Sequence, residues 1–126
     1  MVKSNRDTIS VNDCQILAHY KYEAEQYIIT LASKEIAENT QPGQFVHLSV
    51  SGVLAMRRPI SVMSVDKGNG TFDLLYKIVG EGTRQLADRK IGDVLSVIGP
   101  IGNGFKMTDK KIPLLIAGGV GMPPVI

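Results

Sequence analysis

Apolar and polar residues alternate along several short stretches of the chain, and this period of two is typical of half-buried β-strands. Turn residues lie between the stretches: Pro42-Gly43 precedes the third, and Asn69-Gly70 marks a hairpin between the fourth and fifth. The pattern predicts six strands in an antiparallel arrangement. They cover residues 9–20, 27–31, 44–50, 60–65, 71–79 and 94–98.

One segment after the fifth strand has helical character. Residues 83–89 follow Gly80-Glu81-Gly82 and end before Gly92-Asp93, so Thr83 is the expected N-cap. The polar residues 35–41 are interpreted as a connection. The predicted fold is mainly β: a six-stranded antiparallel Greek-key barrel with one short helix.

The last twenty residues have a different pattern. Residues 112–117 are continuously apolar, as in a strand buried on both faces of a parallel sheet. Gly118, Gly119, Val120 and Gly121 follow as a candidate nucleotide-binding turn. We therefore expect a barrel domain over residues 1–108 and the start of a truncated α/β nucleotide-binding domain over 109–126. An uncovered apolar strand there could pair with a second copy of the chain, which would give a homo-oligomer.

Composition excludes several classes of protein. The chain has 126 residues, 44% of them hydrophobic and 21% charged, with a net charge of +2, so one globular domain is expected and nucleic acid is not an expected partner. No leader and no apolar window of membrane-spanning length is present, which predicts a cytoplasmic protein without a membrane partner. Cys14 is the only cysteine, and His19 and His47 are far apart in sequence. We expect no metal site, a buried Cys14 and a structural His47.

Two features suit a bound anion. Arg58, at the start of the fourth strand, can bind a diphosphate through its two-pronged guanidinium, whereas Arg57 is expected to be solvated. Gly82 and Thr83 begin the predicted helix, where free backbone amides attract phosphate. Plainer explanations exist for each, namely solvated arginines on an edge strand and a threonine that only caps its helix. Their occurrence together on one small barrel favours a diphosphate site.

Residues beside these two features suit a flat polar ring. Pro59 and Ile60 offer an aliphatic surface and Ser61 a hydroxyl, so the combination with a diphosphate predicts a flavin. A second side of the site would come from the strand that leads to the helix, through Leu75, Tyr76, Lys77 and Ile78. Tyr76 could equally be an aromatic residue half buried in the sheet.

Five motifs occur along the chain in this order: Arg58-Pro59-Ile60-Ser61, Gly80-Glu81-Gly82-Thr83, Gly92-Asp93, the segment 99–105 and the segment 117–121. In order and spacing they resemble the motifs of the ferredoxin reductase-like flavoproteins, and Pro42-Gly43-Gln44-Phe45-Val46 also fits. Within that superfamily the chain is most similar to the electron-transfer subunits of bacterial NAD-dependent dihydroorotate dehydrogenases.

The resemblance implies FAD as the cofactor. It implies that Arg58 binds the diphosphate, that Pro59, Ile60 and Ser61 line the flavin, and that Gly82 with Thr83 holds phosphate. It further implies that Leu75, Tyr76 and Lys77, with Ile78, flank the ring and ribityl chain, and that residues 118–121 lie under NAD. Plant-type reductases have tyrosine where this chain has Ile60, so that aromatic stack is missing here.

For a complete subunit, the resemblance implies an electron path. Electrons pass from dihydroorotate through FMN in a catalytic partner subunit and a two-iron, two-sulfur cluster to FAD, and then to NAD, in pyrimidine biosynthesis. The cluster and the full NAD domain are expected only in full-length relatives, so whether this chain alone is an enzyme stays open and no catalytic residue is predicted. The alternatives are a hydrogenase, sulfide dehydrogenase or oxygenase reductase, or a non-enzymatic barrel without flavin.

Overall fold

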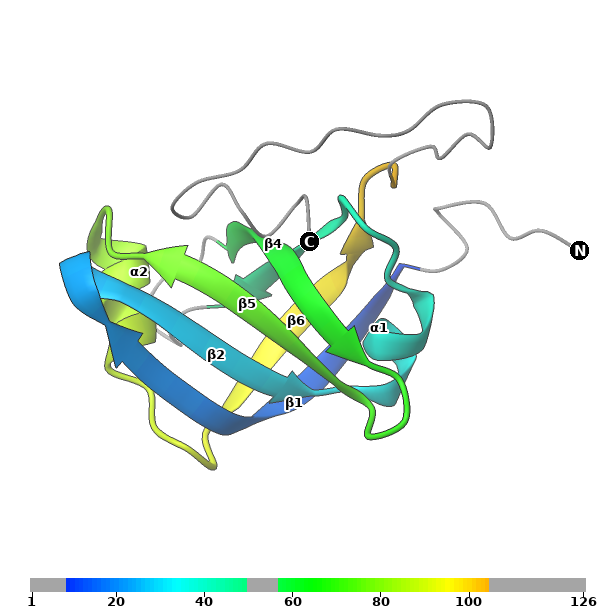
Figure 1. Ribbon diagram of the computed structural model, residues 1–126, viewed down its shortest axis with the longest axis horizontal. Coiled ribbons are helices and arrows are strands. Elements are labelled where there is room, and N and C mark those ends of the chain that lie inside the picture. The colour runs from blue at the N-terminus through cyan, green and yellow to red at the C-terminus, as the bar shows by residue number, and fades with distance from the viewer. Residues whose placement is uncertain (1–8, 50–56, 105–126) are drawn as a thin grey trace, which may run out of the picture.

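Six strands form a closed antiparallel barrel in a computed structural model of the chain, which describes residues 9–49 and 57–104 (Figure 1). The strands follow one another around the barrel in the order β1-β2-β5-β4-β3-β6. Consecutive strands β3, β4 and β5 are neighbours, and β6 returns beside β3, which is a Greek key. The predicted fold is therefore confirmed. The strands are β1 Ser10–Tyr22, β2 Gln26–Ala32, β3 Phe45–Ser49, β4 Arg57–Asp66, β5 Thr71–Lys77 and β6 Val94–Ile101.

The first strand closes the barrel because it pairs with β6, the last strand, as well as with β2. Its first half pairs with β6, from Ser10 opposite Gly99 to Gln15 opposite Val94. Its second half pairs with β2, ending with Tyr22 opposite Gln26. The register shifts between Ile16 and Ala18, so a bulge bends β1 where it passes from one partner to the other.

Turn residues act as the sequence pattern predicts. Gly70 has a positive φ of 67° in the β4–β5 hairpin, and its N–H donates to the carbonyl of Asp66 at 2.8 Å. The Asp66 carboxylate accepts from the backbone N–H of Asn69 at 3.1 Å and from the Asn69 side chain at 2.7 Å, and these two bonds lower the pKa of the carboxyl. Gly43, after Pro42, likewise has a positive φ of 93°. A 3-10 turn, η2 Glu23–Glu25, connects β1 to β2.

Two α-helices are present, and the sequence pattern indicated only one of them. The helix α1 Lys34–Asn39 occupies a segment that was interpreted as a polar connection. It begins at Ser33, whose Oγ accepts from the N–H of Ile36 at 3.2 Å, and it buries Ile36 and Ala37. Six residues are too few to give a clear helical period, so the pattern missed it. The second helix, α2 Glu81–Ala87, begins two residues earlier than predicted.

The core fills the inside of the barrel with side chains from alternate positions of every strand. On β3 the inward residues are Val46 and Leu48, both fully buried, whereas Phe45 and His47 lie on the outer face. Leu86 of α2 belongs to the same core and is fully buried. Cys14 is also fully buried, as predicted.

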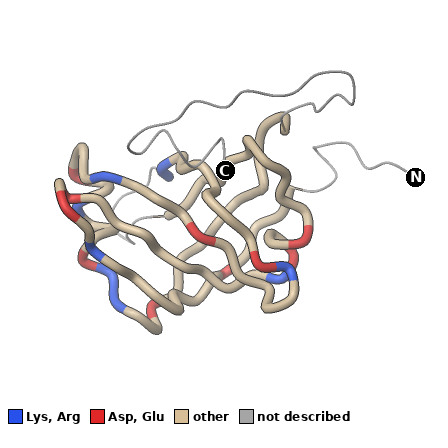
Figure 2. Tube along the Cα trace, viewed as in Figure 1, with Lys and Arg blue, Asp and Glu red and all other residues tan. Residues whose placement is uncertain are grey.

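Lysines and arginines are interspersed with aspartates and glutamates in the described part of the chain, mostly toward the two ends of the barrel (Figure 2). Among the described residues, none of the helices is long and apolar enough to cross a membrane. Within residues 9–49 and 57–104, three or more His, Cys, Asp or Glu side chains do not come together as metal ligands. The predicted segment 109–126, with Gly118, Gly119, Val120 and Gly121, lies outside the described residues.

Candidate functional site

A groove of about 270 Å³ runs along β4 and β5 to the start of α2. It unites residues from the two predicted ring-binding segments and the predicted phosphate turn, which lie up to 24 positions apart in the sequence. The lining residues are Pro59, Ile60, Ser61, Leu75, Tyr76, Lys77, Val79 and Thr83. The barrel topology explains the convergence, because β4 and β5 are paired neighbours and α2 follows β5 directly.

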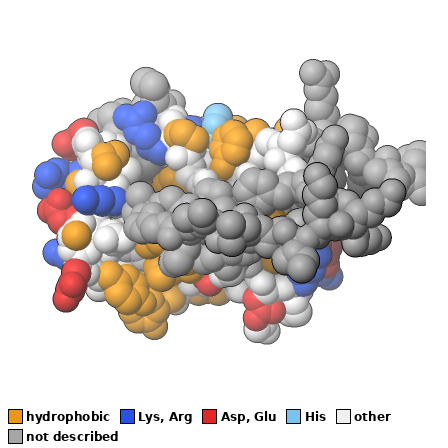
Figure 3. Space-filling view, turned by 45° about the horizontal axis from the view of Figure 1, so that its top comes forward, with side chains coloured by type: hydrophobic (Ala, Val, Ile, Leu, Met, Phe, Trp, Pro, Cys, Tyr) orange, Lys and Arg blue, Asp and Glu red, His pale blue; other side chains and the backbone are white. Residues whose placement is uncertain are grey.

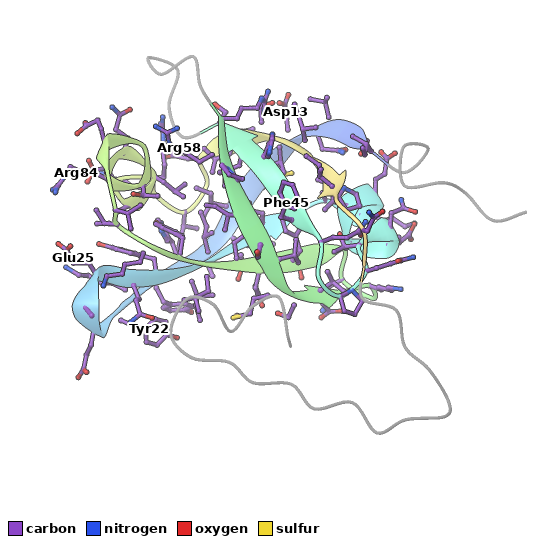
Figure 4. All side chains as sticks on the ribbon, turned by 90° about the horizontal axis from the view of Figure 1, so that it is seen from above. Asp13, Tyr22, Glu25, Phe45, Arg58 and Arg84 are labelled. Atoms are coloured by element: carbon purple, nitrogen blue, oxygen red, sulfur yellow. The ribbon has the colours of Figure 1, made fainter. Side chains whose placement is uncertain are left out.

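Arg58 reaches the start of α2 and lies against Gly82. A Cβ atom on Gly82 would overlap Nε of Arg58 and would lie 3.2 Å from both its Cγ and its Cζ. Figure 4 shows Arg58 beside α2, at the end of the barrel that also carries Arg84. Arg58 pairs with the inward-facing Leu48 in the β3–β4 ladder, so its side chain emerges at the end of the barrel that α2 covers. The two predicted anion-binding features thus meet.

Arg57 has a different environment, and the prediction that it is solvated was wrong. Its guanidinium donates to the carbonyl oxygen of Ser96 and to the Ser96 hydroxyl, both at 2.8 Å. Because β3 lies between β4 and β6, the Arg57 side chain extends over the outer face of β3 to reach Ser96. Among the described residues Arg58 has no such hydrogen bond or ion pair, so its positive charge remains available to a ligand.

Thr83 stabilises the first turn of α2 from within and is not its N-cap, which corrects the prediction. Gly80 is the N-cap, and Thr83 stands three positions later. The Thr83 Oγ1 accepts from the N–H groups of Val79 at 2.9 Å and Gly80 at 3.2 Å, and it donates to the Gly80 carbonyl. Its hydroxyl is therefore fully used. The first amides of the helix, which have no intrahelical partner, are the groups that can face an anion.

Tyr76 contributes its backbone to the groove, because its side chain points into the barrel. The ring belongs to the core and is 4% exposed. Its hydroxyl lies 2.6 Å from Nε2 of His19, and burial raises the pKa of Tyr76. Strand alternation puts the side chains of Leu75 and Lys77 on the opposite, outer face. Of the two interpretations of Tyr76, the buried aromatic describes its side chain.

The remaining predicted residues occupy distinct places. Pro59 is exposed, Ile60 is 8% exposed and Ser61 is half-buried along the β4 side of the groove. Ile78 does not line the groove; its N–H donates to the carbonyl of Glu25 at 3.2 Å, which anchors the end of β5. Sequence reasoning missed Val79, whose side chain is 83% exposed at the groove. An apolar residue directly before Gly80-Glu81-Gly82 was the available signal.

Apolar side chains also reach the surface between charged ones at several other places (Figure 3). Tyr20 and Tyr22, 61% and 53% exposed, are the aromatic examples among the described residues. Single exposed apolar residues are normal on a folded protein and by themselves mark no site.

Comparison with known proteins gives consistent matches. Residues 16–105 match the oxidoreductase FAD-binding domain family. A relative from Bacillus cereus (strain B4264), named dihydroorotate dehydrogenase B (NAD(+)), electron transfer subunit, is 38% identical, and the match covers 80% of this chain and 46% of the relative. The chain thus spans about half the length of such relatives.

Solved structures share the fold. An NADH-dependent reduced ferredoxin-NADP oxidoreductase superposes with a TM-score of 0.70 at 28% identity, over 74% of this chain and 34% of that one. The ferredoxin reductase of carbazole 1,9a-dioxygenase superposes with a TM-score of 0.80 at 23% identity, over 92% of this chain and 37% of that one. The second similarity, at its lower identity, concerns the fold alone.

Proposed function

The chain belongs to the oxidoreductase FAD-binding domain family, and we propose that it is the FAD-binding portion of an electron-transfer subunit that carries electrons from dihydroorotate dehydrogenase to NAD. The relative with 38% identity bears the name of that subunit. Its catalytic dihydroorotate dehydrogenase subunit is the proposed partner, and pyrimidine biosynthesis in the cytoplasm the proposed setting. A complete NAD site and an iron-sulfur cluster belong to the proposal only for a full-length protein.

The contact between Arg58 and Gly82 carries the proposal. Gly82, which is buried, is covered by an arginine that has no carboxylate partner among the described residues, and this gives a cationic surface at the start of a helix. A diphosphate fits this surface, because the guanidinium can bind two oxygens while the first amides of α2 supply further donors. The residues present therefore fit the diphosphate of FAD.

The groove next to this surface suits the rest of the cofactor. Pro59 on one side and Leu75 on the other present aliphatic surface to a flat ring, whereas the Ile60 side chain belongs to the core and Ile60 lines the groove mainly with its backbone. The Ser61 hydroxyl can hydrogen-bond a polar ring edge, and Lys77 adds positive charge to the groove. When bound, FAD supplies the transfer of electrons and hydride, whereas the chain binds it, orients it and limits its contact with water.

Titration of the purified chain with FAD, followed by flavin fluorescence, tests the proposal. We expect Arg58→Ala to raise the dissociation constant at least tenfold, because a charge-assisted hydrogen bond contributes about 1.5–3 kcal/mol. Arg84→Ala is the matched control: it removes the same charge from an exposed position of α2, and it should change the constant less than threefold. Equal effects of both variants would indicate general electrostatics only. An absence of FAD binding by the parent chain would contradict the proposal and favour a barrel that has lost its flavin.

The proposed electron donor needs a separate test. Anaerobic dihydroorotate, added together with the catalytic subunit of a dihydroorotate dehydrogenase, should bleach the visible flavin band of a full-length subunit that contains this sequence and the iron-sulfur cluster. Neither component alone should do so. Bleaching by a ferredoxin or hydrogenase subunit, and not by this one, would assign the chain to another reductase system of the same fold.

A further inference from the structure

His19 lies under the groove and connects the end of α2 with β5. Its Nδ1 is 3.0 Å from the carbonyl oxygen of Arg89, just past the last turn of α2. Its Nε2 is 2.6 Å from the hydroxyl oxygen of Tyr76, on the strand that lines the groove. One imidazole thus bridges the two elements that supply the diphosphate side and one ring side of the site.

The direction of both hydrogen bonds follows from the partners. A carbonyl oxygen only accepts, so Nδ1 of His19 carries a proton and donates to Arg89. Burial raises the pKa of Tyr76, so its hydroxyl keeps its proton and donates to Nε2. Both ring nitrogens of His19 are then hydrogen-bonded, and the bridge runs from β5 through His19 to the end of α2.

Ring contacts hold the bridge in place. The rings of Tyr76 and Tyr27 stack at a centroid distance of 5.3 Å with an interplanar angle of 10°. The His19 ring is 5.4 Å from that of Tyr27 and 6.0 Å from that of Tyr76. The cluster of His19, Tyr27 and Tyr76 therefore comes from three neighbouring strands, β1, β2 and β5, and fills the end of the barrel below α2.

The bridge is one of the contacts that hold α2 on the barrel, together with the fully buried side chain of Leu86. The helix has seven residues, about 10 Å of length. Thr83 ties its first turn to Val79 and Gly80 in the segment that follows β5, and His19 ties the segment after its last turn to Tyr76. Gly82, beneath Arg58, lies between these attachments. A loss of the second attachment would let the diphosphate side shift relative to Leu75 and Lys77.

We propose, on the basis of the proposed function, that His19 is a positioning residue for FAD. Through its bonds to Tyr76 and Arg89, His19 sets the spacing between the diphosphate end and the ring end of the groove. His19 itself touches no ligand. The spacing matters because FAD must occupy both ends at once, and the gain from joining two binding groups depends on the geometry between their sites.

Binding of three ligands to the purified chain tests this role. FAD occupies both ends of the groove, riboflavin only the ring end and ADP only the diphosphate end. We expect Tyr76→Phe and His19→Phe to weaken FAD binding by about tenfold, with changes below about threefold for riboflavin and ADP, measured directly or by competition. His19→Gln keeps an acceptor for the Tyr76 hydroxyl and should lose less than His19→Phe. Tyr20→Phe, which removes an exposed hydroxyl from the same strand as His19, is the control.

The outcomes separate the two proposals. Equal losses for all three ligands would mean general destabilisation and would overturn the positioning role, as would an unchanged FAD affinity in folded Tyr76→Phe. If His19→Phe does not fold, Tyr76→Phe decides, because it keeps the stacked ring. FAD binding by the parent that none of these variants weakens overturns the positioning role alone. No FAD binding by the parent overturns the proposed function and, with it, the positioning role.

Discussion

The side chain of Arg58 covers Gly82 so closely that the α-carbon of Gly82 has no room for a substituent. The Cγ and Cζ atoms of Arg58 each lie 3.2 Å from the place that a Cβ would take. The contact with Arg58, and not the backbone conformation, therefore limits which residues fit here without a shift of the arginine, since the φ of Gly82 lies outside the left-handed range. This relationship joins residues that are distant in sequence and gives the site its cationic end.

Gly82→Ala should displace Arg58 and weaken FAD binding. The added methyl group cannot coexist with the present arginine position, so we expect at least a tenfold rise in the dissociation constant with little change in stability, because alanine favours a helix. Gly80→Ala is the matched control, since a Cβ there meets nothing within 4 Å and the backbone is extended. Fluorescence titration with FAD measures both. Equal affinities of the two variants would show that the position of Arg58 is unimportant.

Arg57→Ala should affect stability and not the cofactor. It removes two hydrogen bonds to Ser96 that connect β4 to β6 across β3, and we expect a loss of about 1–2 kcal/mol in the free energy of unfolding. FAD affinity should change less than threefold. Urea denaturation measures the first quantity and titration the second, with Lys67→Ala, in the exposed hairpin, as the control for lost charge. A large loss of affinity together with intact stability would instead make Arg57 a ligand.

Cys14 should make the protein sensitive to alkaline pH. Burial, with a further effect of the Asp13 charge, raises the pKa of the thiol from 9.0 to about 12. The unfolded chain loses this proton first, so the contribution of Cys14 to stability is complete below pH 9 and declines as the pH rises toward about 12. The difference in free energy of unfolding between the parent and Cys14→Ala should shrink over that range. A difference that stays constant up to pH 12 would contradict the raised pKa of Cys14.

The same burial predicts slow thiol chemistry. At pH 8 a thiol reagent should label native Cys14 roughly a hundredfold more slowly than the urea-unfolded chain, because only the accessible thiolate reacts. Rapid labelling of the folded protein would show that the strand opens locally.

The alternation of apolar and polar residues was sufficient to predict the strands of the barrel, because every second residue of a β-strand faces the core. It placed all six strands and the Asn69-Gly70 hairpin, which the structure confirms. It missed α1, whose six residues complete fewer than two helical turns. It also placed the start of α2 at Thr83, because a threonine before a helical run fits an N-cap as well as it fits the position that Thr83 occupies, three residues later.

The residues of the site could be predicted from the sequence only in part. Residues of the groove could be named because they stand in short motifs. The role of Arg57 could not be predicted, since its bond to Ser96 depends on β3 lying between β4 and β6, a property of topology. The bridge from His19 to Tyr76 and Arg89 was hidden for the same reason, because three distant segments meet only in the closed barrel.

The pairing of β1 with β6 also determines when the domain can fold. Ser10 and Gly99, which are hydrogen-bonded across the seam between β1 and β6, are 89 positions apart in the sequence. Such distant contacts require a costly loop closure, and they make folding slow relative to domains with local contacts. During synthesis the barrel cannot close before β6 has left the ribosome. Until then β1 has an unpaired edge over its first half, and this is the period in which the nascent chain is most exposed to aggregation.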